Sequence, residues 1–285
     1  MSINWSDYLI QEIAYRRVIL FLGSGISATA KNDAGESPLT WEDFITRAQA
    51  LLDNPTPEIL AFIKDMITQK NYLMALQVIF NKTDQGKYSH FINEVFSRQN
   101  FKSSDVHQYI KDIDCKITIT TNFDRIYDIL CNEHGYTTAT YMESKKIIIN
   151  LKSTQNIIIK AHGNIDDIPN IVFTQEQYYR ARMENPEFYQ LLNSLFLTHT
   201  ALFLGYSLND PDINLILENV ANSTSPSTPH YIVVKEGVHE QIKEHWLKSY
   251  NMSCIEYGPN YSDLDDNILK LSTLVSNYRA SKRMP

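Results

Sequence analysis

The stretch that decides the fold is VILFLGSGIS at residues 18–27, in which five consecutive apolar residues lead into a turn of glycine and serine. An apolar run of this length, followed by turn residues, is typical of a strand buried on both faces of a parallel sheet. Glycines at this point let the backbone approach a pyrophosphate, and the N–H groups of a following helix favour its negative charge. The stretch therefore predicts phosphate binding by Gly23, Ser24, Gly25 and Ser27, although an ordinary tight turn uses the same residue types.

Other short apolar runs recur along the chain, and segments with helical spacing of apolar residues lie between them. We expect strands at residues 116–120, 157–161, 201–204 and 231–234. The alternation predicts an α/β fold with a doubly wound, mainly parallel Rossmann-like sheet, which binds ligands beyond the carboxyl ends of its strands. Residues 40–113 carry several consecutive helical patterns instead, and we interpret them as a helical insertion within a single domain that spans residues 1–285.

The composition is that of an ordinary globular protein, with 43% hydrophobic and 21% charged residues. A formal charge of -7 gives no electrostatic reason to expect nucleic acid as a ligand. The three cysteines are scattered and cannot form a four-thiolate zinc site. No apolar stretch approaches the ~20 residues that a membrane span needs, so we expect a cytoplasmic protein without membrane contact.

Polar residues follow the second and third of these strands. Asn122 and Asp124 lie in TTNFDR at residues 120–125, where either can cap a helix, and a capping role does not exclude a role in a site. His162 comes directly after the strand at 157–161 and before Gly163. A lone histidine is more often structural, but its place at a strand end favours a functional role.

A fourth strand end repeats the pattern. The string LFLGYSLNDPD at residues 202–212 passes from an apolar run through Gly205 and Ser207 to the start of a helix. Because the carboxyl ends of parallel strands lie along one edge of a sheet, all four motifs are expected to meet there.

The order of these motifs resembles the successive signatures of the sirtuin family. GSGIS at 23–27, TNFD at 121–124, HG at 162–163 and GYSL at 205–208 carry the resemblance, which extends from about residue 15 to about residue 260. The longer strings TTNFDR and GYSLNDP, together with SPLTW at 37–41, look more like the sirtuin-like NAD hydrolases of bacterial anti-phage defence, such as the Thoeris effectors.

Two departures separate the chain from the deacylase branch of that family. Sirtuin deacylases place a four-cysteine zinc module after the His-Gly motif, whereas residues 164–200 contain no cysteine. The Pro-Asp-Phe-Arg string of the deacylase cofactor loop is also missing from residues 30–37. The resemblance therefore implies hydrolysis of NAD to nicotinamide and ADP-ribose, without a metal, rather than removal of acyl groups from lysine. Cyclic ADP-ribose stays open as a product.

The resemblance also implies the role of each site residue. Asn122 and His162 would be catalytic, with Asn122 positioning a water or the ribose and His162 accepting a proton. Asp124 would hold the nicotinamide carboxamide. Gly23, Ser24, Gly25 and Ser27 would face the pyrophosphate, and Gly205 and Ser207 would close the other side of the cofactor.

Alternative functions remain open from sequence. One is an NAD-dependent protein deacylase or ADP-ribosyltransferase, and another is a non-catalytic sensor subunit that binds NAD or ADP-ribose. Because uncontrolled loss of NAD would kill a host cell, an NAD hydrolase of this kind needs restraint. We expect a homo-oligomer regulated by a separate sensor or activator protein.

Overall fold

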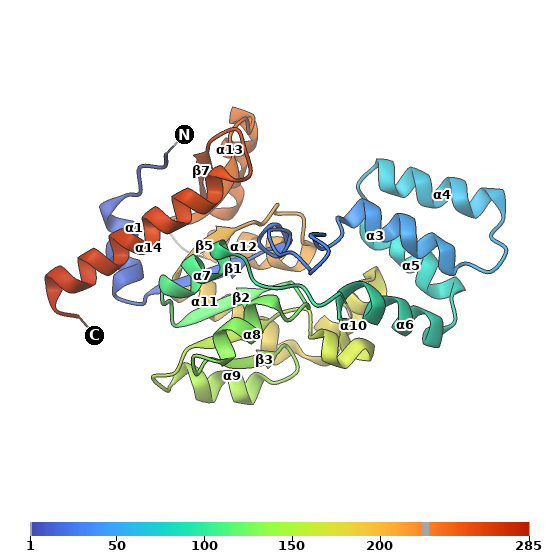
Figure 1. Cartoon of the computed structure of the whole chain (residues 1–285), viewed down its shortest axis with the longest axis horizontal. Helices are drawn as coiled ribbons and strands as arrows, with labels where there is room; N and C mark the ends of the chain where they lie inside the picture. The colour runs from blue at the N-terminus through green and yellow to red at the C-terminus, as the bar shows by residue number, and fades with distance from the viewer. Residues whose placement is uncertain (1, 98, 224–227, 285) are drawn as a thin grey trace.

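A computed structural model describes residues 2–97, 99–223 and 228–284, and a seven-stranded sheet forms its centre (Figure 1). The strand order is β3-β4-β2-β1-β5-β6-β7, and all six neighbouring pairs run parallel. The prediction of a doubly wound, Rossmann-like α/β fold is therefore confirmed. The strands are β1 (Val18–Leu22), β2 (Ile117–Thr120), β3 (Thr137–Thr140), β4 (Ile157–Lys160), β5 (Thr200–Leu204), β6 (His230–Lys235) and β7 (Met252–Tyr257).

The continuous apolar run of β1 is explained by helices on both faces of the sheet. Ile19 and Phe21 point into one core, and Val18, Leu20 and Leu22 point into the other. The first core is completed by α9 (Ser144–Leu151), α10 (Gln175–Glu184), α11 (Pro186–Thr198), α12 (Pro211–Ser223) and α13 (Glu240–Tyr250). The second core is completed by α1 (Asp7–Ala14), α7 (Asp105–Asp112), α8 (Ile126–Asn132) and α14 (Asp263–Lys282).

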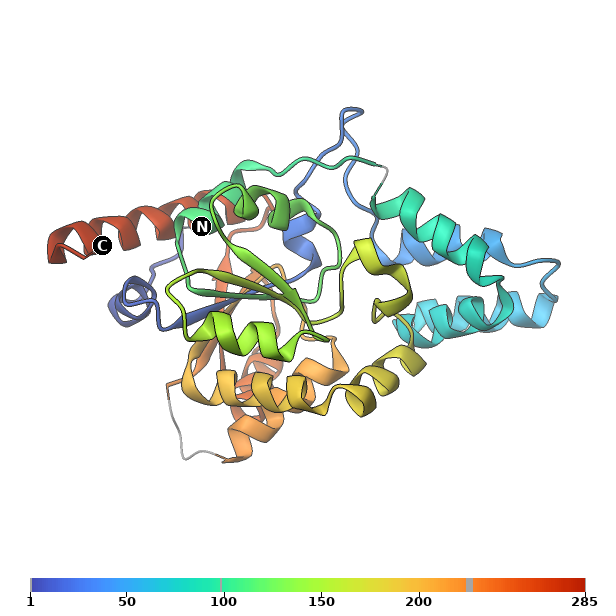
Figure 2. The same cartoon turned by 90° about the horizontal axis from the view of Figure 1, so that it is seen from below.

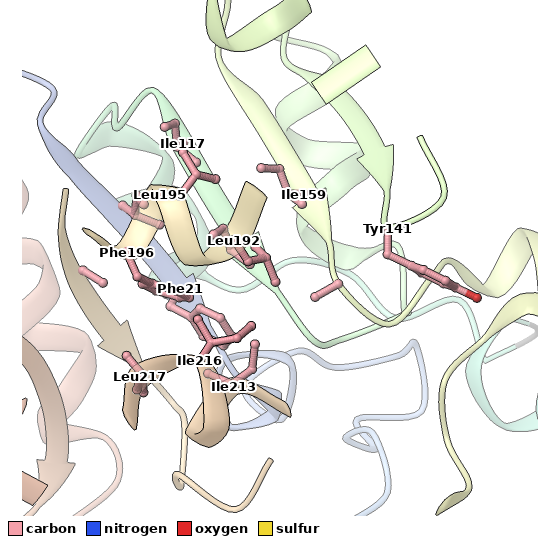
Figure 3. Packing of buried hydrophobic residues seen from close by; sticks show 14 of the residues in the cluster. Phe21, Ile117, Tyr141, Ile159, Leu192, Leu195, Phe196, Ile213, Ile216 and Leu217 are labelled. Atoms are coloured by element: carbon pink, nitrogen blue, oxygen red, sulfur yellow. The ribbon is translucent and has the colours of Figure 1, made fainter. Parts of the chain in front are cut away.

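Figure 3 shows the first core at close range. Phe21 lies against Phe196 of α11, with their ring centroids 6.2 Å apart. The ring centroids of Phe21 and Phe203 are 4.6 Å apart and stacked. This tight packing fixes the position of β1 and β5, and therefore of the two loops that leave their carboxyl ends.

The two outermost strands were not among those expected from sequence. β3 reads TTAT, and only Ala139 in it is buried. β7 reads MSCIEY, and only its two end residues are buried. Both strands lie at a sheet edge, where one neighbour is missing and burial is partial, so neither produces the uninterrupted apolar run by which the central strands are found.

The segment between β1 and β2 forms a helical lobe beyond the carboxyl edge of the sheet (Figures 1 and 2). It begins with α2 (Ser24–Ser27) and continues through α3 (Trp41–Ala48), a short 3-10 helix at Gln49–Leu51, α4 (Pro57–Thr68), α5 (Tyr72–Lys82) and α6 (Gln85–Phe96). Helices α3 to α6 have their own apolar core, shared with Phe123 and Phe173 from loops beyond the sheet. The segment at 40–113 also contains α7, which packs against α14 in the core of the sheet. Its description as an insertion stays a prediction.

The strand order reverses between the neighbouring strands β1 and β5. β1 is followed by β2 on one side, and β5 is followed by β6 on the other. A doubly wound sheet binds its ligand in the crevice that forms at such a switch point. In the described residues, no helix has both the length and the apolar character needed to cross a membrane.

Candidate active site

A cavity of about 660 Å³ opens at the carboxyl edge of the sheet, beneath the helical lobe. Seven of the nine predicted site residues belong to its wall: Ser24, Gly25, Asn122, Asp124, His162, Gly205 and Ser207. The remaining two predicted residues, Gly23 and Ser27, are not among the described residues that line it. The four strand-end motifs therefore converge on one space.

The glycine turn after β1 lies directly against the turn after β5. The Gly23 N–H donates to the Leu204 carbonyl, and the Gly25 N–H donates to the Gly205 carbonyl, both at 2.9 Å. A Cβ atom added at Gly23 would lie 2.4 Å from the Gly205 oxygen, so only glycine fits there. Gly205 itself has a φ of +61°, a backbone conformation that favours glycine. The glycines of both motifs are thus required by the close approach of the two turns.

Asn122 ties the turn after β1 to the loop after β2. Its side-chain amide donates to the Gly23 carbonyl and to the Ser27 hydroxyl oxygen, both at 2.9 Å. The Ser27 hydroxyl in turn donates to Asp124 Oδ2 at 2.7 Å. Ser27 is buried, and its hydroxyl is used within this frame, so its predicted contact with a pyrophosphate remains untested.

Asp124 combines capping with a place in the cavity wall. Its Oδ1 accepts the Ile126 N–H at 3.0 Å, at the start of α8. Its backbone carbonyl accepts a hydrogen bond from Lys160, whose ammonium also donates to Asp128 Oδ2 at 2.8 Å. Lys160 is fully buried, and burial raises the pKa of Asp128 while the Lys160 charge opposes that rise. A buried ion pair therefore supports the Asp124 loop from below.

His162 lies against a carboxylate and a tyrosine that sequence did not assign to the site. Its Nε2 is 3.1 Å from Asp210 Oδ2, and its Nδ1 is 3.4 Å from the Tyr178 hydroxyl. The Tyr178 hydroxyl donates to the same Asp210 oxygen at 2.7 Å. All three side chains are buried, and all three residues line the cavity. Asp210 Oδ1 also accepts the N–H groups of Asp212 and Ile213, which start α12.

Sequence contained only weak signals for these partners. Tyr178 lies on α10 at helical spacing, which is more typical of a core residue. Its side chain is only 6% exposed, but its hydroxyl donates a hydrogen bond to Asp210. Asp210 is part of the GYSLNDP string that supported the resemblance, but its contact with His162 depends on a fold that joins β4, α10 and the loop after β5.

Aromatic side chains from the helical lobe and from the loop before α10 also line the cavity. The Trp41 and Tyr72 rings are stacked 5.9 Å apart at an angle of 6°, and Trp41 lies 5.0 Å from Phe173. Two cations, Lys70 and Arg182, also line the space. Such a cavity can hold flat bases against its aromatic side and phosphates at its glycine turns.

No group of three or more His, Cys, Asp or Glu side chains within the described ranges is placed to hold a metal ion. The polar groups of the wall are instead paired with one another or with backbone atoms at the starts of helices. The arrangement suits proton transfer and positioning, with negative ligand groups placed at the glycine turns.

The chain is similar to known proteins over most of its length. Residues 116–255 match the family model described as a SIR2-like domain. The chain is 23% identical over 231 residues to "NAD(+) hydrolase ThsA" of Enterococcus faecium, covering 78% of this chain and 44% of that protein. It is 22% identical over 204 residues to "Defense-associated sirtuin 2" of Bacillus subtilis, covering 70% and 19%. A second "NAD(+) hydrolase ThsA", of Cytobacillus dafuensis, is 22% identical over 201 residues, covering 70% and 37%.

The chain spans less than half the length of each of these relatives. The aligned part nevertheless reaches across most of this chain, as the resemblance of the four motifs predicts. The matched segment 116–255 contains the Asn122, His162 and Gly205 motifs at the carboxyl edge of the sheet. The match places a SIR2-like domain at residues 116–255 of this chain.

Proposed function

We propose that this protein is an NAD glycohydrolase, which cleaves the bond between nicotinamide and ribose. The observation that carries the proposal is the convergence of Asn122, His162 and two glycine turns on a single cavity of about 660 Å³. This volume lies within the range of small-molecule and cofactor sites. Two relatives with the name NAD(+) hydrolase support the same activity.

Cleavage of this bond depends more on the positioning of the reacting groups than on acid catalysis. Nicotinamide leaves as a neutral base, so the main demand is to stabilise an oxocarbenium-like ribose and to direct water to C1′. Asn122 stands at the inner wall of the cavity, where it would orient that water or the ribose. Asp124, beside it, would hold the nicotinamide carboxamide.

His162 would act as the general base. The contact of its Nε2 with Asp210 Oδ2, at 3.1 Å, would orient the ring while it accepts a proton from a ribose hydroxyl or from water. Tyr178 steadies Asp210 through its own hydrogen bond. Both residues are positioning residues in this scheme, because they act through His162.

The glycine turns would take the pyrophosphate. Ser24 and Gly25 present the first turn of α2 to the cavity, and Gly205 and Ser207 line the opposite side. Gly23 and Ser27 would contribute from behind, by holding the two turns and Asn122 in register.

The test is incubation of the purified protein with NAD alone, followed by chromatography of the products. Asn122→Ala and His162→Ala are compared with His134→Ala, an exposed histidine that lies outside the cavity wall. We expect nicotinamide and ADP-ribose from the unmodified protein and from His134→Ala, and no products from the other two variants.

The alternatives give different results in the same experiment. Acceleration of NAD consumption by an acylated peptide would indicate a deacylase, and transfer of ADP-ribose to protein would indicate a transferase. NAD binding without turnover at every concentration would indicate a sensor. The last result would also require repetition with an activating partner before it counted against the enzyme.

We also propose that the activity serves anti-phage defence in the cytoplasm, through a homo-oligomer controlled by a separate sensor or activator. The relative named as a defence-associated sirtuin supports this setting. The test compares NAD consumption per chain across a dilution series with the molecular mass measured by light scattering at each concentration. Activity that stays constant while the mass stays at one chain would contradict control by assembly.

A further inference from the structure

A second, much smaller space adjoins the cavity. Its volume is about 10 Å³. Asn122 and Asp124 line both this space and the main cavity, and so form the partition between them. The other residues around the small space that carry polar side-chain groups are Ser27, His107, Thr120, Tyr127 and Asp128. The mechanism above uses neither His107, Thr120 nor Tyr127.

His107, on α7, is the unexplained group at this place. Its side chain is 99% buried, at 1% exposure, and its Nε2 has no hydrogen-bond partner among the described residues. The backbone N–H of Ser104 donates to Nδ1 at 3.2 Å, so Nδ1 presents its lone pair. Burial lowers the pKa of His107 to about 4, which keeps the ring neutral near pH 7. The single ring proton is therefore on Nε2.

An N–H donor in this position is costly unless something accepts its hydrogen bond. The adjoining space has the volume of about one water molecule, and a buried water needs two to four polar partners. Potential partners surround it, including the Asp124 carboxylate and the Ser27 hydroxyl. Asp124 is close enough for its negative charge to raise the pKa of His107 against the effect of burial.

We propose that this space binds one ordered water, which accepts the His107 Nε2–H and links it to the Asp124 side of the partition. His107 is then a positioning residue for Asn122 and Asp124, although it does not reach the cavity. The role in positioning rests on the proposed NAD cleavage, whereas the water site itself does not.

The same helix is joined directly to the glycine turn. The hydroxyls of Ser104 and Thr29 lie 2.7 Å apart, and Thr29 donates to the Ile26 carbonyl at 2.7 Å. The bound water would complete a second connection, from α7 to the loop after β2. Together the two connections would fix the turn after β1 and the loop after β2 to one helix.

The first test is structural and independent of activity. A crystal structure that resolves ordered waters should show one within hydrogen-bond distance of His107 Nε2, and nitrogen NMR should place the ring proton on Nε2. A proton on Nδ1, or a direct protein partner at Nε2 with no water, would overturn the site.

The second test separates positioning from stability. His107→Leu removes the donor, and His107→Gln keeps a donor at the end of the side chain. With the leucine variant we expect the water to be lost and kcat to fall roughly tenfold or more, since small displacements of catalytic groups are costly. With glutamine we expect kcat to recover to within about threefold of the unmodified protein, with little change in KM for either variant.

Failure of the positioning role and failure of the proposed NAD cleavage give different results in these tests. A leucine variant that folds, loses the water and keeps full kcat would overturn the positioning role. If the unmodified protein cleaves no NAD under any condition, the proposed function fails, while the water and the ring proton still decide the site.

Discussion

Substitution of Gly205 by alanine tests whether the two glycine turns are held together by backbone contact. Gly205 has a φ of +61°, and an added Cβ would lie 2.6 Å from the Ile26 nitrogen and 2.9 Å from the Gly25 carbonyl carbon. Two of the three nearest atoms belong to the backbone, which cannot rotate away. The matched control is Gly35→Ala, because Gly35 has a φ of +80° but nothing within 4 Å of the added atom.

The magnitudes follow from these two environments. A left-handed conformation costs an alanine about 1 kcal/mol, and this is the whole effect expected at Gly35. Overpacking of a filled site adds about 1–3 kcal/mol at Gly205, and backbone neighbours favour the upper end. We therefore expect a loss of about 1 kcal/mol for Gly35→Ala and about 4 kcal/mol for Gly205→Ala, or Tm decreases of about 3 °C and about 10 °C.

The assay is thermal and urea unfolding of both variants, with NAD turnover measured well below either Tm. Gly205→Ala should also lose most of its turnover, because the turn after β1 must move to accommodate the new atom. Equal destabilisation of the two variants would refute the reasoning, since it would leave only the shared backbone strain.

Three further predictions concern groups beneath or beside the site. Asp210→Asn keeps an oxygen for the N–H groups of α12 but changes the partner of His162, so kcat should fall roughly a hundredfold or more with little change in Tm; steady-state kinetics and melting curves check both parts. Lys160→Met leaves Asp128 buried without its cation and should cost about 3–5 kcal/mol in urea unfolding, part of which Asp128→Asn should restore in the double variant. Burial lowers the pKa of His230 to about 4, and its Nδ1 accepts the Ala201 N–H, so the folded state favours the neutral ring. The resulting stability is present above pH 6.5 and is lost as the pH falls towards 4, by about 2 kcal/mol at pH 5, and His230→Gln should reduce this pH dependence of unfolding.

The sequence predicts the centre of the fold much better than its edges. β1, β2, β4, β5 and β6 begin and end within one residue of the expected strands. β1, β2 and β4 are buried at every position, and β5 at all but its first. β3 and β7 are stabilised by a strand on one side and by tertiary context. The local sequence pattern of a strand contains no information about either contribution.

The site divides in the same way. Strand-end motifs place Asn122, Asp124 and His162 at one edge because topology alone brings parallel strand ends together. The partners of these residues lie on helices and loops. The orientation of these elements against the sheet decides which of their side chains reach the site. Tyr178 illustrates the limit, because helical spacing correctly indicates burial and contains no information about its hydroxyl.

Capping and function coincide at this edge for a physical reason. Each strand ends where a helix must begin, so its loop needs a short polar side chain to satisfy the first N–H groups of the helix. Asp124 and Asp210 both do this with Oδ1, which leaves Oδ2 for Ser27 in one case and for His162 and Tyr178 in the other. The helix fixes one oxygen of each carboxylate and thereby orients the other. Alanine at either position would remove both contributions together, whereas the exchange of aspartate for asparagine keeps the cap and changes only the oxygen that faces the site.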